Sequence, residues 1–272
     1  MPLLTTDPPS RGIIHYEVYG KGRPVLFLHG WLGSWQLWRE TIARVGERYR
    51  TYSLDFWGFG ESKGFGPQNE AVQEFTVSAF VDMVGQFMNK LGIPKAAVIG
   101  HSMGGTVAMS SAIRYPERVV KTCAIGSPIN GETLYWALKI GGNPFMASLG
   151  FLVPPALRFI IGSYVYMAAN DGQVVRTMVL DDLSRTTMQS FFESINTLRR
   201  TDLTSELAQV QQPLLGIYGK KDIIVSPKNH KIMQNLVPHA EVKWYPNSGH
   251  FPMIDDQEKF IEDILEFLDS RA

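Results

Sequence analysis

The stretch that decides the fold lies near the middle of the chain and reads Val98-Ile99-Gly100-His101-Ser102-Met103-Gly104-Gly105. An apolar run typical of a buried strand leads into it, and a helical pattern over 103–115 follows it. A turn sharp enough to leave one hydroxyl in the open forces Ser102 toward positive φ. Side chains at positions 100 and 104 would collide across such a turn, so Gly100 and Gly104 are needed there. The stretch therefore predicts a strand, a strained serine and a helix whose N-terminal N–H groups face the hydroxyl.

Short β-rich runs alternate with helical patterns along most of the chain. Several of the runs are continuously apolar, which is typical of strands covered on both faces of a parallel sheet. The alternation predicts an α/β fold with a mostly parallel sheet flanked by helices. The expected strands span 13–19, 24–28, 50–54, 96–99, 119–125, 213–218 and 241–245, and the expected helices span 34–48, 76–91, 103–115, 227–236 and 255–269.

The alternation stops between residues 129 and 200, where the pattern is helical or loop-like and rich in Tyr, Phe, Met and Leu. We interpret this segment as a helical insertion, so that residues 1–128 and 201–272 form the core and residues 129–200 a second unit. Thr201 or Asp202 is expected to cap a further helix that leads to Pro213. Bends between the helices of the insertion are expected at Gly141-Gly142 and Pro154-Pro155.

A serine hydroxyl is a good nucleophile only beside a general base, and that base needs a group that orients it. His250 stands in a loop after the last expected strand, and Asp222 follows the strand 213–218. Open α/β sheets place their sites at that end of their strands, so Ser102, Asp222 and His250 are the expected catalytic residues. The loop after strand 119–125 offers a rival acid in Glu132. Among the other histidines, the side chain of His101 is expected to point away from the serine turn. His15 is expected to be structural, and His230 and His239 to be solvated.

Four further motifs, together with the serine turn, resemble the α/β-hydrolase superfamily in order and over nearly the whole chain. They are Leu28-His29-Gly30-Trp31-Leu32-Gly33-Ser34, Asp55-Phe56-Trp57-Gly58-Phe59-Gly60-Glu61-Ser62, Gly219-Lys220-Lys221-Asp222-Ile223-Ile224-Val225-Ser226-Pro227 and Gly249-His250-Phe251-Pro252. The resemblance implies that the backbone N–H groups of Trp31 and Met103 form an oxyanion hole, with His29 and Gly30 shaping its loop. It also implies that the insertion 129–200 is a helical cap above the site.

The chemistry implied by this resemblance is hydrolysis through an acyl-enzyme. Haloalkane dehalogenases and epoxide hydrolases of the superfamily carry aspartate at the nucleophile position, so Ser102 disfavours both. The expected function is that of a serine carboxylesterase for short-to-medium, uncharged acyl esters, which needs neither a metal nor an organic cofactor. Two alternatives stay open: a C–C bond hydrolase of ring-cleavage products, and a hydrolase-fold binding protein without catalysis.

The insertion is expected to supply an apolar wall above Ser102. Between Leu134 and Asn170 the only charged residues are Lys139 and Arg158. A wall of this kind favours an acyl or aromatic group over a charged one. The candidate lining residues are Tyr135, Trp136, Phe145, Met146, Phe151, Phe159, Tyr164, Tyr166 and Met167.

Charge and composition bear on partners and location. Basic and acidic residues balance at 26 each and the isoelectric point is near 7.0, which indicates no nucleic-acid partner. Cys123 is the only cysteine, so an internal disulfide and a multi-cysteine metal site are excluded.

The N-terminus has no basic region followed by an apolar stretch, so we expect no signal peptide and a cytoplasmic location. Glycine and proline interrupt the apolar stretch 134–170, which predicts no membrane span and leaves transient contact with a lipid surface open. The expected partner is a small-molecule ester, and nothing in the sequence predicts the oligomeric state.

Overall fold

A single sheet runs through the computed structural model, which describes residues 2–6, 12–62, 74–141 and 154–270. The described strands pair in the order β1-β2-β4-β3-β5-β6-β7-β8. The pairs β1–β2 and β2–β4 are antiparallel, and every pair from β4 to β8 is parallel. The strands are β1 (Leu3–Thr5), β2 (Ile13–Tyr19), β3 (Pro24–Leu28), β4 (Arg50–Leu54), β5 (Ala96–His101), β6 (Val119–Ile125), β7 (Leu214–Gly219) and β8 (Glu241–Tyr245). The expected mostly parallel α/β sheet is confirmed.

Strand β5 lies at the centre of the sheet, and each of its six residues is buried. A continuous apolar run suits this place because both faces of a central parallel strand are covered. In register, Gly100 pairs with Leu28 of β3 and with Ala124 of β6. The carboxyl ends of these three neighbouring strands are therefore level, and the loops that follow them meet at the carboxyl-terminal end of the sheet.

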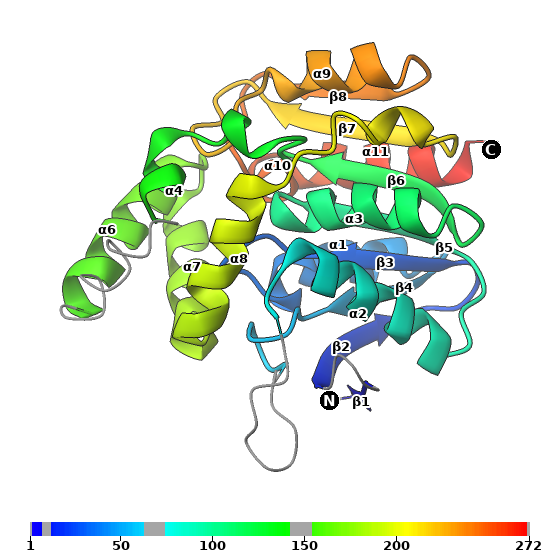
Figure 1. Cartoon of the computed structure of the whole chain (residues 1–272), viewed down its shortest axis with the longest axis horizontal. Helices are drawn as coiled ribbons and strands as arrows, with labels where there is room; N and C mark the ends of the chain where they lie inside the picture. The colour runs from blue at the N-terminus through cyan, green and yellow to red at the C-terminus, as the bar shows by residue number, and fades with distance from the viewer. Residues whose placement is uncertain (1, 7–11, 63–73, 142–153, 271–272) are drawn as a thin grey trace.

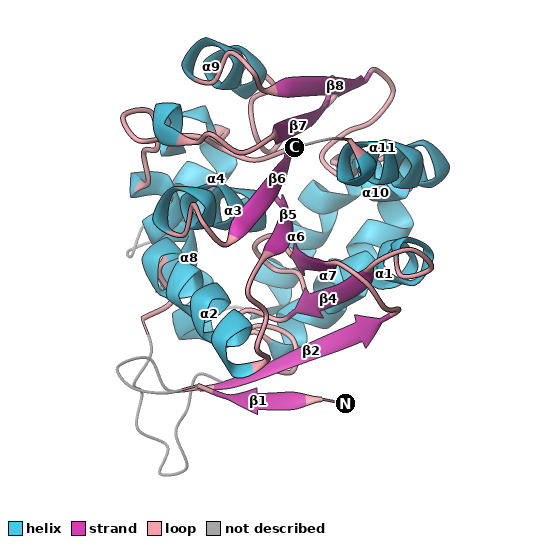
Figure 2. Cartoon of the chain, turned by 90° about the vertical axis from the view of Figure 1, so that its right-hand side faces the viewer, coloured by secondary structure: helices cyan, strands magenta, loops and turns pink. Residues whose placement is uncertain are grey.

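Helices cover both faces of the sheet, as Figures 1 and 2 show. One face carries α1 (Arg39–Val45), α10 (Pro252–Asp255) and α11 (Gln257–Asp269), and the other carries α2 (Val77–Lys90), α3 (Met103–Arg114) and α9 (Asn229–Leu236). Helices α2 and α11 each bury an apolar stripe of the period that a helix requires. The 3₁₀ helices are η1 (Trp35–Trp38), η2 (Gly131–Thr133) and η3 (Leu207–Gln209).

The insertion leaves the core after β6 and contains α4 (Trp136–Gly141), α6 (Pro154–Met167), α7 (Gly172–Arg185) and α8 (Met188–Arg200). Its two ends are bonded to each other, because Gly131 N donates to Thr201 O at 2.9 Å and Leu203 N donates to Ile129 O at 2.9 Å. In Figure 1 these helices lie beyond the carboxyl edge of the parallel strands. The division at residues 129 and 200 into two domains stays a prediction.

Two local expectations differ from the structure. Strand β1 is not expected from the sequence, because three residues are too few to show a strand period. The segment between Thr201 and Pro213 contains only the short 3₁₀ helix η3, and the predicted cap at Thr201 or Asp202 is wrong. Thr201 ends α8, and the Asp202 side chain instead accepts a hydrogen bond from Thr204 N at 2.9 Å in a turn.

The expected bends in the insertion coincide with helix ends where they are described. Gly141 is the last residue of α4 and Pro154 the first of α6, whereas Gly142 lies outside the described residues. Across the described part of the chain, no helix is both long and apolar enough to span a bilayer.

Candidate active site

The turn at Ser102 has the strained geometry that the sequence predicts. Ser102 has φ 52° and ψ −118°, and α3 begins at the next residue. A Cβ on Gly100 would lie 2.1 Å from Gly104 O, and one on Gly104 would lie 2.3 Å from Leu28 O. No side chain fits at either position, so the requirement for both glycines is confirmed. The strain is held by the strand before the turn and the helix after it, and it places the hydroxyl at the helix N-terminus.

His250 and Asp222 form a buried hydrogen-bonded pair. His250 Nδ1 lies 2.7 Å from Asp222 Oδ2, and the two residues are 2% and 5% exposed. Asp222 Oδ1 accepts hydrogen bonds from Ile224 N at 2.8 Å and Val225 N at 2.9 Å, which fixes the carboxylate. Because a carboxylate accepts, His250 Nδ1 carries the proton and Nε2 is the basic nitrogen of the neutral ring.

Two neighbours bring this pair to the Ser102 turn. A Cβ on Gly126, which follows β6 at φ 52°, would lie 3.1 Å from His250 Nδ1 and 3.4 Å from Asp222 Oδ2. On the other side, the ring of His101 packs on the ring of His250 with centroids 4.5 Å apart. The three expected catalytic residues therefore converge at one end of β5, β6 and β7, and their catalytic roles stay predictions.

His101 takes part in the site, which the sequence did not indicate. Its Nε2 lies 2.9 Å from the backbone oxygen of His250, so Nε2 carries a proton and donates it to that carbonyl. Burial and the nearby His250 hold the pKa of His101 well below its usual range, which keeps the ring neutral. A histidine directly before the serine is the only sequence signal that could have pointed to this contact.

The expected oxyanion loop lies against the serine turn. A Cβ on Gly30 would lie 3.1 Å from Ser102 Cβ and 2.9 Å from His101 Nδ1, so only glycine allows this approach. Within the described part of the chain, the backbone N–H groups of Trp31 and Met103 donate to no other group, whereas the indole N–H of Trp31 does have a partner. Two N–H groups without partners, beside a serine at a helix N-terminus, are the donors that a developing oxyanion requires.

The histidine loop is tied to the insertion through Asp255 of α10. Asp255 Oδ2 accepts from Ser248 Oγ at 2.7 Å and from Gly249 N at 2.9 Å, and Oδ1 accepts from Asn170 N at 2.8 Å. His250 N also donates to Ala168 O at 2.7 Å. The residues between α6 and α7 thus help to place His250, a dependence that lies outside any sequence motif.

Other contacts join the insertion to the core loops at the carboxyl-terminal end of the sheet. Trp31 Nε1 donates to Phe191 O at 3.0 Å, and Ser190 Oγ donates to Gly58 O at 2.7 Å. Tyr164 donates its hydroxyl proton to Ile223 O at 2.6 Å, next to Asp222. Burial and the charge of Asp222 raise the pKa of Tyr164 to about 12. The insertion therefore touches the loops after β3, β4, β7 and β8.

Most of the expected lining residues do not form a closed wall. Trp136, Phe159 and Met167 are 71%, 67% and 62% exposed, and Tyr135 and Tyr166 are also exposed. Tyr164 is half-buried, and Phe145, Met146 and Phe151 lie outside the described residues. Hydrophobic composition alone did not indicate which of these side chains face solvent.

The remaining candidates stand away from the pair. Glu132, the rival acid, is exposed and forms an ion pair with Lys139 at 2.8 Å, which holds the pKa of its carboxyl below the usual range. His239 is exposed, as expected. His230 is half-buried and packs on Trp244 instead of being solvated.

Comparison with known proteins agrees with this architecture. Residues 23–146 match the family model for the alpha/beta hydrolase fold. The pimeloyl-[acyl-carrier protein] methyl ester esterase of Nitrosospira multiformis is 25% identical over 93% of this chain and 97% of its own length. A thermophilic esterase from Thermogutta terrifontis superposes with a TM-score of 0.82 at 23% identity, covering 98% of both chains. A meta-cleavage product hydrolase from Pseudomonas fluorescens superposes with a TM-score of 0.79 at 20% identity, covering 99% of this chain and 97% of its own.

The regions that match known proteins include the elements that form the candidate site. The match over residues 23–146 includes the expected oxyanion loop, the segment after β4 and the serine turn. The solved structures extend the likeness to the whole sheet and the helical insertion. The parallel sheet, the order of its motifs and these comparisons together show that the chain has the alpha/beta-hydrolase fold.

Proposed function

We propose that the protein is a serine carboxylesterase that acts on uncharged esters with short-to-medium acyl groups. The observation that carries the proposal is the strained Ser102 beside a buried His250–Asp222 pair. Likeness to esterases in sequence supports the same class of reaction. The described parts of α4 and α6 hold only two charged residues, Lys139 and Arg158, which supports an uncharged substrate.

The proposed reaction is acyl transfer in two steps. His250 Nε2 takes the hydroxyl proton as Ser102 Oγ attacks the ester carbonyl carbon. The N–H groups of Trp31 and Met103 hold the resulting oxyanion. The imidazolium then protonates the leaving alcohol, and an acyl-enzyme remains. Water attacks the acyl carbon with His250 again as base, and Ser102 recovers its proton when the acid leaves.

Turnover of p-nitrophenyl acetate, butyrate, octanoate and palmitate tests the substrate class. Each added methylene that becomes buried raises kcat/KM by up to about fourfold, because it contributes about 0.8 kcal/mol. We expect kcat/KM to rise from acetate to butyrate or octanoate. Activity confined to a ring-cleavage dienoate, measured in parallel, would replace this proposal with a C–C bond hydrolase.

The same assay tests the nucleophile. Ser102→Ala should lower kcat by about 10⁴-fold or more and abolish labelling by a fluorophosphonate, while the circular dichroism spectrum stays unchanged. Near-native turnover in this variant would contradict the proposal. Labelling of the wild-type chain without appreciable turnover of any ester would instead indicate a binding protein.

A further inference from the structure

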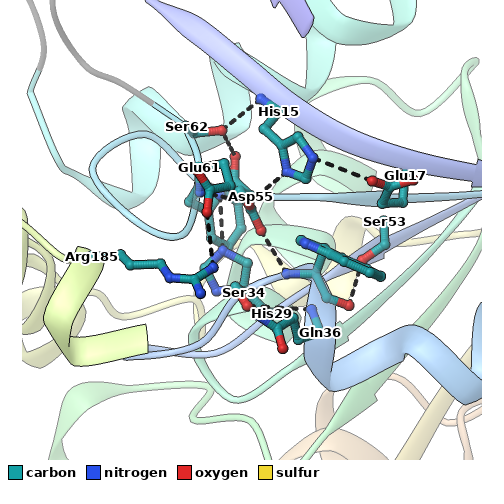
Figure 3. A network of polar contacts seen from close by, with 12 residues as sticks. His15, Glu17, His29, Ser34, Gln36, Ser53, Asp55, Glu61, Ser62 and Arg185 are labelled. Atoms are coloured by element: carbon teal, nitrogen blue, oxygen red, sulfur yellow. Dashed lines mark hydrogen bonds and ion pairs between the residues drawn. The ribbon is translucent and has the colours of Figure 1, made fainter. Parts of the chain in front are cut away.

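Asp55, directly after β4, lies at the centre of a polar network that the proposed reaction does not use (Figure 3). Both of its carboxylate oxygens accept hydrogen bonds from parts of the chain that are distant in sequence. Oδ1 accepts from Trp35 N at 2.6 Å, and Oδ2 accepts from Glu61 N at 2.9 Å and lies 2.7 Å from His15 Nδ1. Three N–H donors around one side chain indicate an ionised carboxylate.

Asp55 and its neighbour Phe56 hold both ends of the oxyanion loop, residues 29–35. At the first end, Phe56 N donates to His29 Nε2 at 2.9 Å, so His29 Nδ1 carries the proton and donates to Gly30 O at 2.7 Å. Burial lowers the pKa of His29 and keeps that ring neutral. At the other end, Trp35 N donates to Asp55. Two consecutive residues therefore fix where this loop begins and where it ends.

The oxyanion loop needs such support because its backbone is strained. Leu32 has φ 57°, which side chains other than glycine rarely adopt, and its side chain is buried. Gly33 N donates back to Gly30 O at 3.2 Å, so the loop is a tight turn. A strained turn persists only when its surroundings fix it, and a released turn would carry Trp31 N–H away from Ser102.

His15 of β2 supplies the counter-charge for Asp55. Both residues are fully buried, and a buried carboxylate is costly unless a cation pairs with it. Burial lowers the pKa of His15, but the hydrogen bond and charge of Asp55, together with Glu17 at 3.4 Å, raise it further than burial lowers it. A Cβ on Gly60 would lie 2.4 Å from Asp55 Oδ2, so glycine leaves the space that the carboxylate fills.

We propose that the hydrogen-bonded His15–Asp55 pair is a clamp that positions the oxyanion loop, and through it the backbone N–H of Trp31, for the tetrahedral intermediate. This inference rests on the proposed esterase function. Neither side chain contacts the reacting atoms, so both are positioning residues. The segment after β4 serves the clamp in two ways: Gly60 leaves room for the carboxylate, and Glu61 N donates a hydrogen bond to it.

The expected consequence is a selective loss in kcat. The oxyanion exists only in the transition state and the intermediate, so a displaced donor weakens those states and leaves ester binding almost unchanged. Asp55→Asn removes the charge and turns an N–H₂ group toward donors. It should lower kcat by about 10- to 100-fold, since a small displacement of a catalytic donor has effects of this size. KM should stay within about threefold of the wild-type value.

Tyr245→Phe is the matched control. Tyr245 donates its hydroxyl proton to Asp263 Oδ2 at 2.6 Å, in a buried contact between β8 and α11 at the other side of the sheet. This variant also removes a buried hydrogen bond to a carboxylate, so it should lower the melting temperature. It should leave kcat unchanged, because the oxyanion loop is not involved.

Inhibition by a trifluoromethyl ketone isolates the oxyanion. Ser102 Oγ adds to the ketone carbon, its proton passes to His250, and the new oxyanion needs the same N–H donors as the intermediate. The inhibition constant should therefore rise in Asp55→Asn by the same factor as kcat/KM falls. His15→Leu should show both effects, and His15→Asn, whose amide N–H can still donate to Asp55, should restore most of the loss.

Hydrogen exchange over residues 29–38 supplies a readout that does not depend on turnover. Exchange should accelerate in Asp55→Asn and His15→Leu, and should stay at the wild-type rate in His15→Asn and Tyr245→Phe. If the wild-type chain hydrolyses no ester but exchange follows this pattern, the esterase proposal fails and the clamp stands. Unchanged exchange and inhibition in His15→Leu would overturn the clamp, as would an equal loss of kcat in Tyr245→Phe. The two His15 variants carry the test if Asp55→Asn does not fold.

Discussion

Asp222 is the residue whose surroundings define its role most closely. One of its oxygens is held by two backbone N–H groups and the other by His250, so the carboxylate has a single orientation. The pair fixes which nitrogen of His250 carries the proton. In the proposed reaction, the same carboxylate would stabilise the imidazolium that forms when His250 accepts a proton.

Asp222→Asn should preserve the fold and lower kcat on p-nitrophenyl butyrate by about 10²–10⁴-fold, because the amide favours the wrong tautomer of His250. Steady-state kinetics and a thermal melt measure the two properties. Glu132→Gln is the matched control, since Glu132 is exposed and paired with Lys139, and it should retain wild-type kcat. The opposite result in these two variants would move the acid to the loop after β6.

Helix α7 contacts the core through a well-formed ion pair and a buried carboxyl group. At its C-terminal end Arg185 forms an ion pair with Glu61 at 2.9 Å (Figure 3). One turn earlier, Asp182 is 1% exposed, and neither carboxyl oxygen forms a well-aligned hydrogen bond within the described residues, although the Ser34 hydroxyl is near. Burial and the charge of Asp55 raise the pKa of Asp182 to about 7.

This position predicts that Asp182→Asn stabilises the protein at neutral and alkaline pH. A carboxyl whose pKa is higher in the folded state destabilises that state as the pH rises from about 4 to about 7, and the cost is constant above that. The gain in unfolding free energy should therefore grow between about pH 4 and pH 7, toward an upper limit on the order of 4 kcal/mol.

Urea denaturation at several pH values measures this gain. Asp181→Asn is the control, because Asp181 is the exposed neighbour on the same helix and pairs with Arg185. Its effect should be small and nearly independent of pH. A gain in Asp182→Asn that does not change with pH would show that the carboxyl is already ionised in the folded state below pH 5.

At the scale of the whole molecule, the buried histidines give the fold a characteristic response to pH. His29 and His101 have lowered pKa values, so they oppose folding only below about pH 6.5, where they ionise in the unfolded chain. His15 is the opposite case, because its pKa in the folded state is raised. Its contribution is complete below about pH 6.5 and is lost as the pH rises through the folded-state value.

We therefore expect the stability advantage of the wild-type chain over His15→Asn to decrease as the pH is raised from about 6 to about 9. Asp182, His29 and His101 are present in both chains, so their contributions cancel in the difference and the change with pH reports on His15. The measurement is the unfolding free energy of the two chains at matched pH values. A difference that stays constant across the window would show that His15 is neutral in the folded protein.

The sequence by itself determined the sheet and the residues that meet at its edge. Short β-rich runs predicted seven of the described strands, and several of these runs are continuously apolar because both faces of such a strand are covered. The glycines at 100 and 104 fixed the serine turn, because only their missing side chains allow it. Parallel strands then place the loops of Ser102, Asp222 and His250 at one edge, so local pattern and chain order were sufficient to predict that they converge.

Only the tertiary structure decided how these residues are supported. The contact of His101 with His250, the bond of His250 N to Ala168 O and the His15–Asp55 pair each join segments far apart in sequence. No local period or motif encodes such a pairing, because it depends on the register of the sheet and on where the insertion packs. The same reason explains why composition did not separate the exposed Phe159 from the half-buried Tyr164 on one helix. Which face of α6 meets the core is set by its neighbours, and a helix that is apolar on most sides carries no signal of its own.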